Sequence, residues 1–166
     1  MFDYETSTFL FKDNIEMGVQ ESSRKARRNV SRMDDIQRET LFLTIKSVID
    51  GIIADKRENP KNTKRLDSFE GRINIGLHVE EDEIMWINLI AKDGEYHVDK
   101  DALEEYDLEL ISDPEDLMFF CNGQYSVMHM MMKKNRFGKR KLRFKGRAYG
   151  KLLALPKILV LDKKKQ

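Results

Sequence analysis

Residues 106–161 read YDLELISDPEDLMFFCNGQYSVMHMMMKKNRFGKRKLRFKGRAYGKLLALPKILVL, and this stretch decides the fold. Its patterning predicts, in order, a strand from Tyr106 to Leu110, a helix ending at Asn122-Gly123, a Met-rich helix over about 126–134, a strand containing Leu142 and Phe144, and an apolar helix over 148–161. No catalytic motif lies inside it. It holds more apolar, flexible side chain than a small core needs, followed at once by a dense run of positive charge.

Residues with known capping roles mark the helix ends in this stretch. Ser112 or Asp113 can accept the first free backbone N–H groups, and Pro114 suits the first turn because it has no N–H to leave unpaired. Asn122-Gly123 fits a left-handed C-cap. The closing helix contains Pro156, which predicts an interruption and a point at which a lid can hinge.

Upstream, a long amphipathic helix begins near Asp34. Asp34 and Gln37 have the spacing of a capping box, and apolar residues then recur at helical spacing over 41–53. The helix is expected to end by Asn59-Pro60, because the residue before a proline disfavours helix. Residues 61–68 are expected to form a polar loop.

Three strands follow, in which apolar residues recur at every second position instead of at helical spacing. Residues 72–79 alternate apolar and polar side chains, which predicts a half-buried strand, and residues 84–91 return as a more fully apolar strand. Residues 92–94 are a turn signal, after which 95–98 continue the meander. Because tight turns join the three strands, this part of the sheet is expected to be antiparallel.

The composition is that of one globular domain with short extensions. A chain of 166 residues with 40% apolar residues is long enough to bury a real core. We place the domain at residues 34–162, after an N-terminal extension at 1–33 and before a basic tail at 163–166. A basic cluster at 24–28 in the extension either contacts phosphates or is a solvated face.

Charge is strongly segregated, although the formal net charge is only +1. Residues 80–116 hold 15 acids against 2 bases, whereas residues 133–166 hold 14 bases against 1 acid. Such asymmetry marks an anionic partner, a membrane surface or nucleic acid, or it only keeps a charge-rich domain soluble. The sequence leaves both interpretations open.

Cysteine usage and hydropathy favour a cytoplasmic location. Cys121 is the only cysteine, so no internal disulfide forms and a reducing compartment is expected. No stretch approaches the ~18 consecutive apolar residues of a membrane span. The N-terminus lacks the pattern of a signal peptide.

The order of elements resembles the sterol carrier protein type 2 family over about residues 34–161. The resemblance is carried by the long helix, the strand meander, the glycine-capped helix at Asn122-Gly123-Gln124, the basic strand ending in Lys145-Gly146 and the closing apolar helix. It implies an α/β (α+β) domain with a five-stranded, mostly antiparallel sheet covered by helices, and an apolar tunnel between sheet and helices. It also implies binding of sterols, fatty acids, acyl-CoA or other lipids, in some members as an accessory domain of a larger enzyme.

Three features depart from the family pattern. The chain carries a basic N-terminal extension, and residues 132–140 form a longer connection than usual. Its C-terminus, Lys-Lys-Lys-Gln, lacks the Ser-Lys-Leu peroxisomal address of some members. The first two leave the position of the pocket mouth undefined, and the third argues against a peroxisome.

The Met-rich segment is the strongest sign of a ligand site. Methionine reshapes easily around an irregular guest, although methionines also fill gaps in ordinary cores. With the resemblance, the predicted ligand-binding residues are Trp86, Leu117, Phe120, Met128, Met131, Met132, Leu142, Phe144, Leu152 and Leu155.

Basic residues follow the Met-rich segment and predict contact with anionic membranes at ~1 kcal/mol per residue. They are Lys139, Arg140, Arg143, Lys145, Arg147 and Lys151. The alternative is a solvated edge strand on which lysines deter aggregation.

No catalytic, metal or cofactor site is predicted. His78, His97 and His129 fall on separate elements, and no Cys or His pair has metal-ligand spacing. We therefore predict non-catalytic binding or transfer of an apolar ligand. The alternatives are a protein-interaction module, an accessory subunit that presents a lipid to a partner enzyme, and nucleic-acid binding, which scarce exposed aromatics disfavour.

Overall fold

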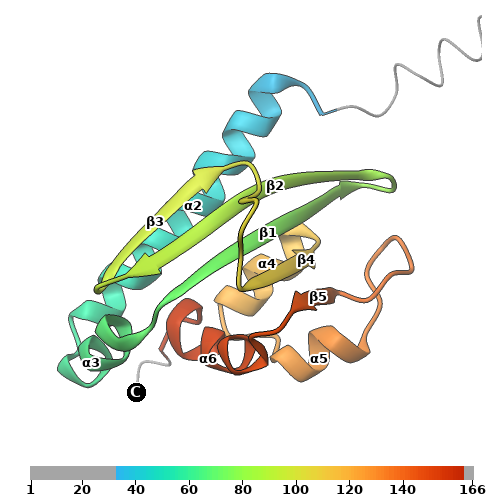
Figure 1. Ribbon diagram of the computed structural model, residues 1–166. Helices are drawn as coiled ribbons and strands as arrows, with labels where there is room; N and C mark the ends of the chain where they lie inside the picture. The colour runs from blue at the N-terminus through green and yellow to red at the C-terminus, as the bar shows by residue number, and fades with distance from the viewer. Residues whose placement is uncertain (1–32, 163–166) are drawn as a thin grey trace, which may run out of the picture. The chain divides into compact units, whose positions relative to one another are not determined.

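The structure is a computed structural model that describes residues 33–162 (Figure 1). Its elements are α2 (Asp35–Arg57), α3 (Pro60–Ser68), β1 (Gly71–Glu80), β2 (Glu83–Lys92), β3 (Glu95–Lys100), β4 (Leu108–Ser112), α4 (Pro114–Cys121), α5 (Val127–Met132), β5 (Leu142–Gly146) and α6 (Tyr149–Leu159). The predictions for the basic cluster at 24–28 and for the tail at 163–166 concern residues outside the described range.

The five strands form one mixed sheet in the order β3-β2-β1-β4-β5. The pairs β1–β2, β2–β3 and β4–β5 are antiparallel, whereas β1 and β4 are parallel. Parallel neighbours cannot be joined by a tight turn, and the chain returns to β4 through the loop at 101–107 (Figure 1). The predicted five-stranded, mostly antiparallel sheet is confirmed.

One face of the sheet is apolar and packs against the helices. The register places Ile73 and Ile75 of β1 on this face beside Leu108 and Leu110 of β4, and all four are buried. Helix α2 covers the β3 side, where the Lys100 ammonium lies 5.2 Å from the Phe42 ring centre. Helices α4, α5 and α6 cover the β4 side.

Helix α2 begins with the predicted capping box. The Gln37 N–H donates to the Asp34 carboxylate at 2.7 Å, and the Asp34 N–H donates to the Gln37 side chain at 3.0 Å. The apolar residues that follow turn one stripe of the helix toward the sheet. The buried members of the stripe are Phe42, Ile45, Ile49, Ile52 and Ile53.

The second face of β1 is also buried, so the prediction of a half-buried strand is wrong. Asn74 holds the loop at 101–107 against this face: its amide donates to the Leu103 carbonyl at 2.9 Å and accepts from the Leu103 N–H at 2.8 Å. The buried Asn88 donates to the carbonyls of Lys100 and Asp101. Asn74 of β1 and Asn88 of β2 therefore bind backbone groups of β3 and the loop instead of water.

Two further predictions are wrong. Residues 61–68 belong to α3, because Asn59 accepts from the Lys61 N–H at 3.1 Å, Pro60 occupies the first turn and Leu66 is completely buried. Helix α6 continues through Pro156 to Leu159. Pro156 lies close to the end of the helix, so little helix remains to be broken.

A buried lysine ties the end of the domain to α2 and α3. The Lys56 ammonium, 2% exposed, donates to the Asp162 carboxylate at 2.8 Å, and the Asn62 amide donates to the other oxygen at 2.5 Å. The hydrogen bond from Lys56 holds the pKa of Asp162 below its usual range, against the opposing effect of burial. This contact fixes the chain just after α6.

Replacing Asp162 with Asn is expected to lower the free energy of unfolding by ~1–2 kcal/mol at neutral pH, because the buried Lys56 ammonium loses its counter-charge. The half-exposed carboxylate keeps the loss below that of a fully buried pair. Since the folded-state pKa of Asp162 is lowered, the contribution is present above the unfolded carboxyl pKa and disappears as the pH falls through the folded value. Urea unfolding from neutral to acid pH measures this.

The matched control is Asp50→Asn, which breaks the exposed Lys46–Asp50 pair on α2. Exposed pairs of this kind contribute less than ~0.5 kcal/mol. If the two variants lose the same free energy of unfolding, the buried Lys56–Asp162 pair contributes no more than an exposed pair, and the prediction is wrong.

Candidate functional site

An apolar cavity lies between the sheet and helices α4, α5 and α6. We call it the inner cavity; its volume is about 20 Å³ and its surface is apolar throughout. It is lined by Ile75, Leu110, Ser112, Leu117, Phe120, Val127, Met130, Leu142, Leu152, Leu155 and Leu159. A cavity of this size holds about one water molecule, so the protein's own side chains fill most of the space between the sheet and these helices.

A larger hollow opens on the surface beside α5 and β5. We call it the outer groove; its volume is about 500 Å³, and it is lined by Met128, Met131, Met132, Arg140, Leu142, Arg143 and Phe144. Met128 is 63% exposed, Met132 65% and Phe144 38%. Apolar side chains gathered around one hollow are typical of a binding surface.

Leu142 belongs to both hollows. It is the first residue of β5, pairs with Ser112 of β4 in the sheet register, and is buried. Its side chain therefore forms part of the wall between the outer groove and the inner cavity.

The structure divides the predicted ligand-binding residues between the two hollows. The inner cavity takes Leu117, Phe120, Leu142, Leu152 and Leu155. The outer groove takes Met128, Met131, Met132, Leu142 and Phe144. Met130, which was not among the predicted ligand-binding residues, is the buried methionine of α5 and faces the inner cavity.

Trp86 lies apart from both hollows. Its register partner is Gly76, so it points to the sheet face opposite Ile75 and Leu110. A Cβ on Gly76 would lie 3.0 Å from the Trp86 ring, and the glycine thus makes room for it. Trp86 lines a separate cleft near the start of α2, and we leave it out of the proposed site.

Three of the predicted membrane-contact residues hold the fold together. Arg140 donates to the Met131 and Met132 carbonyls at 2.7 and 3.4 Å and so caps the end of α5. Lys139 donates to the Glu81 carbonyl at 3.0 Å. Lys151 pairs with Asp107 at 3.2 Å and donates to the Glu70 carbonyl.

The other three are available to a partner. Within residues 33–162, the side chains of Arg143, Lys145 and Arg147 make no ion pair or hydrogen bond, and Lys145 and Arg147 are exposed. Phe144 lies between Arg143 and Lys145, and Tyr149 follows Arg147 by two positions; both rings are exposed, with their centres 5.9 Å apart. Basic and aromatic side chains are thus interleaved at the open edge of the sheet.

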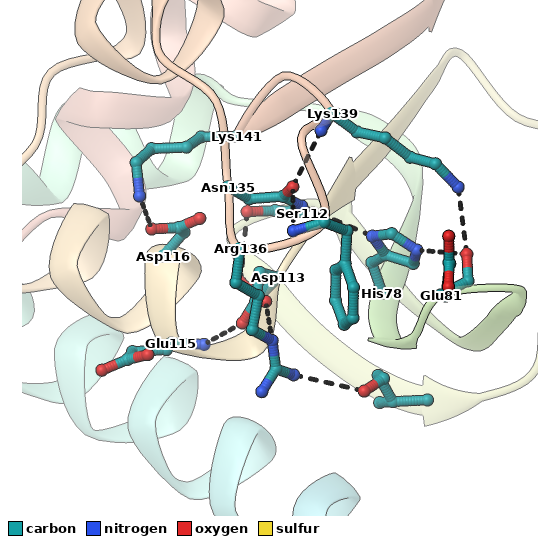
Figure 2. A network of polar contacts seen from close by, with 12 residues as sticks. His78, Glu81, Ser112, Asp113, Glu115, Asp116, Asn135, Arg136, Lys139 and Lys141 are labelled. Carbon is teal, nitrogen blue, oxygen red and sulfur yellow. Dashed lines mark hydrogen bonds and ion pairs between the residues drawn. The ribbon is translucent and has the colours of Figure 1, made fainter. Parts of the chain in front are cut away.

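Residues 133–141 form a hairpin loop, where the sequence indicated only a long connection. The Lys141 N–H donates to the Lys133 carbonyl at 2.9 Å, and the Asn135 N–H donates to the Lys139 carbonyl at 2.7 Å. Gly138 has a φ of +72°, so the spacing from Asn135 to Gly138 is a turn signal that could have revealed the hairpin. Figure 2 shows this loop bound to β1 and to the start of α4.

Two ionisable groups near the site are held in one protonation state. Burial raises the pKa of the Cys121 thiol to about 12, which makes it a poor nucleophile at neutral pH. Burial lowers the pKa of Lys141, but the hydrogen bond and charge of Asp116 outweigh this effect, so the pKa lies above its ordinary value. The Lys141–Asp116 ion pair fixes the residue before Leu142 to α4.

The described part of the chain has neither a metal-ligand cluster nor a helix that could span a membrane. Among residues 33–162, no three His, Cys, Asp or Glu side chains gather in a way that could hold a metal ion. No helix in the same range combines the length and the apolar character needed to cross a membrane.

Similarity to known proteins is found in structure alone. No protein-family model and no curated protein matches the sequence. The solution structure of sterol carrier protein domain 2 of Helicoverpa armigera aligns with a TM-score of 0.53 and 13% identity, covering 72% of this chain and 91% of that one. Apo sterol carrier protein 2 from Yarrowia lipolytica gives a TM-score of 0.49 and 16% identity over 69% of this chain and 89% of that one. UbiJ-SCP2, a ubiquinone synthesis protein, aligns with a TM-score of 0.49 and 12% identity, covering 77% of this chain and 95% of that one.

The chain therefore has the fold of sterol carrier protein 2 domains, as the order of its elements predicted. At 13% identity the likeness establishes the fold alone.

Proposed function

We propose that the domain at residues 34–162 binds an apolar lipid between the sheet and helices α4–α6, without catalysis. The observation that carries this proposal is the position of Leu142, which separates an exposed apolar groove from an apolar cavity directly behind it. A lipid chain that passes Leu142 moves from one apolar surface to another. The ligand named for sterol carrier proteins supports the same class of guest.

The inner cavity must widen to accept a ligand, and α5 is the element best suited to move. It has only six residues, of which Met130 alone is buried. Methionine side chains can reshape around a guest. Each CH₂ that enters contributes ~0.8 kcal/mol, which offsets the loss of packing and of chain freedom.

An uncharged inner cavity indicates the orientation of the ligand. The apolar surface gives no partner to a charged or polar head group. Arg143, by contrast, lines the outer groove and has no ion-pair partner in residues 33–162. The hydrocarbon part therefore occupies the inner cavity and the polar end stays in the groove.

Filling the inner cavity should abolish binding. In Leu155→Trp the larger ring occupies the space of the ligand, because Leu155 is 2% exposed and lines the cavity. We expect at least about a tenfold loss of affinity for fluorescent fatty acid and sterol probes, equivalent to ~1.4 kcal/mol. Titration of probe fluorescence measures it.

Leu153→Trp is the matched control, since Leu153 lies on the same helix and is 55% exposed. Its affinity should equal that of the wild type. Saturable binding that survives equally in both variants, or no binding of any probe to the wild type, would overturn the proposal.

We further propose that the domain approaches anionic membranes through Arg143, Lys145 and Arg147. Phe144 and Tyr149 add the aromatic side chains that favour a membrane–water interface. The alternative, binding of single-stranded nucleic acid, would use the same basic and aromatic side chains.

Reversing two charges tests this surface. Lys145→Glu/Arg147→Glu should weaken binding to vesicles containing phosphatidylserine by about 30-fold, or ~2 kcal/mol, since each basic residue contributes ~1 kcal/mol. Co-sedimentation measures the binding, and Lys61→Glu/Lys92→Glu, at exposed residues elsewhere, is the control of equal charge. Wild-type protein that binds RNA but no vesicle would favour the nucleic-acid alternative.

A further inference from the structure

A buried histidine holds the hairpin loop, and the lipid site does not account for it. His78 is 1% exposed and lies on the sheet face opposite the inner cavity. Its ring packs against Phe137 of the loop, with the ring centres 4.4 Å apart. Figure 2 shows the ring between the turn at Glu81 and the loop at Asn135.

Hydrogen bonds define the state of the His78 ring. Nε2 lies 3.0 Å from the Glu81 carbonyl oxygen, which can only accept, so Nε2 carries a hydrogen. Nδ1 lies 3.4 Å from the Asn135 side-chain nitrogen, which donates to it. Both contacts are satisfied together only in the neutral ring with its hydrogen on Nε2.

The amide of Asn135 cannot turn over without loss. Its oxygen accepts from the backbone N–H groups of Phe137 and Lys139, each at 3.0 Å. These two bonds fix the nitrogen on the side of His78. A reversed amide would leave both backbone donors of the loop without their acceptor.

We propose that His78 is a positioning residue that keeps the hairpin loop docked while its imidazole is neutral and releases the loop when the ring is protonated. A proton on Nδ1 places a donor against the Asn135 donor. This inference rests on the proposed function, because it assigns a proton-dependent control to the same lipid site.

The charged groups around the ring favour release. On the loop, Arg136 donates to the Val79 carbonyl at 3.2 Å, and Lys139 donates to the same Glu81 carbonyl as the ring. Asp113, the N-cap of α4, faces the network, but it is paired with Arg136 at 2.8 Å. The acids of the turn at 80–82 are exposed. A new positive charge thus meets two cations and no unpaired buried acid in the described residues.

Arg140 connects the loop to the lipid site. It lies at the end of the hairpin, lines the outer groove and caps the last carbonyls of α5. When the loop is released, Arg140 no longer binds the last carbonyls of α5. The Lys141–Asp116 pair still holds the start of β5. Helix α5 can then move away from Leu142.

Protonation of His78 would be favoured at the surface of an anionic membrane. Its surface potential of about −30 mV raises the local proton concentration about threefold. The loop would therefore open more often at the surface that Lys145 and Arg147 are proposed to contact. Ligand exchange would be favoured where the ligand is delivered or collected.

Hydrogen exchange of the full chain tests the loop directly. We expect the protection of the Phe137 and Lys139 amides to fall about tenfold between about pH 8 and about pH 5, the range in which histidines generally titrate. Amides of β1 should keep their protection and serve as the internal reference. Unchanged protection of the two loop amides would overturn the proposal.

Variants assign the response to one histidine. The chain has three histidines, so His97→Gln/His129→Gln leaves His78 alone and should respond like the wild type. His78→Gln keeps a donor and an acceptor but cannot be protonated, and its loop should stay protected at both pH values. A response in His78→Gln equal to that of the wild type would contradict the role of His78.

A second variant tests the proposal independently, in case His78→Gln does not fold. Asn135→Asp offers a carboxylate to the protonated ring while still accepting from the loop, so its loop should stay protected at about pH 5. Loss of protection equal to that of the wild type would overturn the proposal.

A ligand measurement separates this inference from the function on which it rests. The release rate of a bound fluorescent fatty acid should rise about threefold or more at the lower pH in the wild type and stay constant in His78→Gln. If no probe binds, the proposed function fails and the exchange data alone decide whether the loop responds. If a probe binds and its release rate does not change with pH, the proposed proton-dependent control of the lipid site is wrong.

Discussion

The fold depends on keeping one face of a five-stranded sheet away from water. Each fully buried Ile or Leu on that face contributes ~1.5–3 kcal/mol, and β1 and β4 place several there. The 23-residue helix α2 covers the β3 side. The β4 side is covered by helices of 8, 6 and 11 residues, α4, α5 and α6. The helical cover is therefore least continuous over β4 and β5.

Both hollows lie under or beside this divided cover. The inner cavity is small and apolar, and the outer groove is wide and open, with Leu142 common to their walls. Lys141 and Lys151 fix the surrounding elements, whereas α5 buries only Met130 and is capped at its end by Arg140. Under the proposed function, this short helix is the element that would move to admit a bulky apolar guest.

Local signals made much of the fold predictable. The capping box at Asp34, the N-cap at Asp113 and the turn at Asn122-Gly123 each act within a few residues, and the structure contains all three. Helix α3 was missed although Asn59 and Pro60 are local start signals, because Leu66, the apolar residue that it buries, has no apolar partner at helical spacing in residues 60–68. The second face of β1 was missed because Asn74 binds a loop 29 residues away.

The candidate site was predictable in composition and less so in arrangement. The sequence indicated a Met-rich wall, but the orientation of a six-residue helix decides that Met130 turns inward while Met128 and Met132 stay exposed. Trp86 was misplaced because its sheet face follows from the pairing with Gly76. His78 and Asn135 lie 57 positions apart in the sequence, so no local pattern predicts their contact.

The most direct test of the central claim is a set of nuclear Overhauser contacts between a bound fatty acid and the methyl groups of the protein. If the space between sheet and helices opens as proposed, the terminal methyl group of the ligand will contact Leu117, Leu152 and Leu155, whose side chains line the inner cavity. Contacts confined to Met128 and Met132 in the outer groove would contradict it.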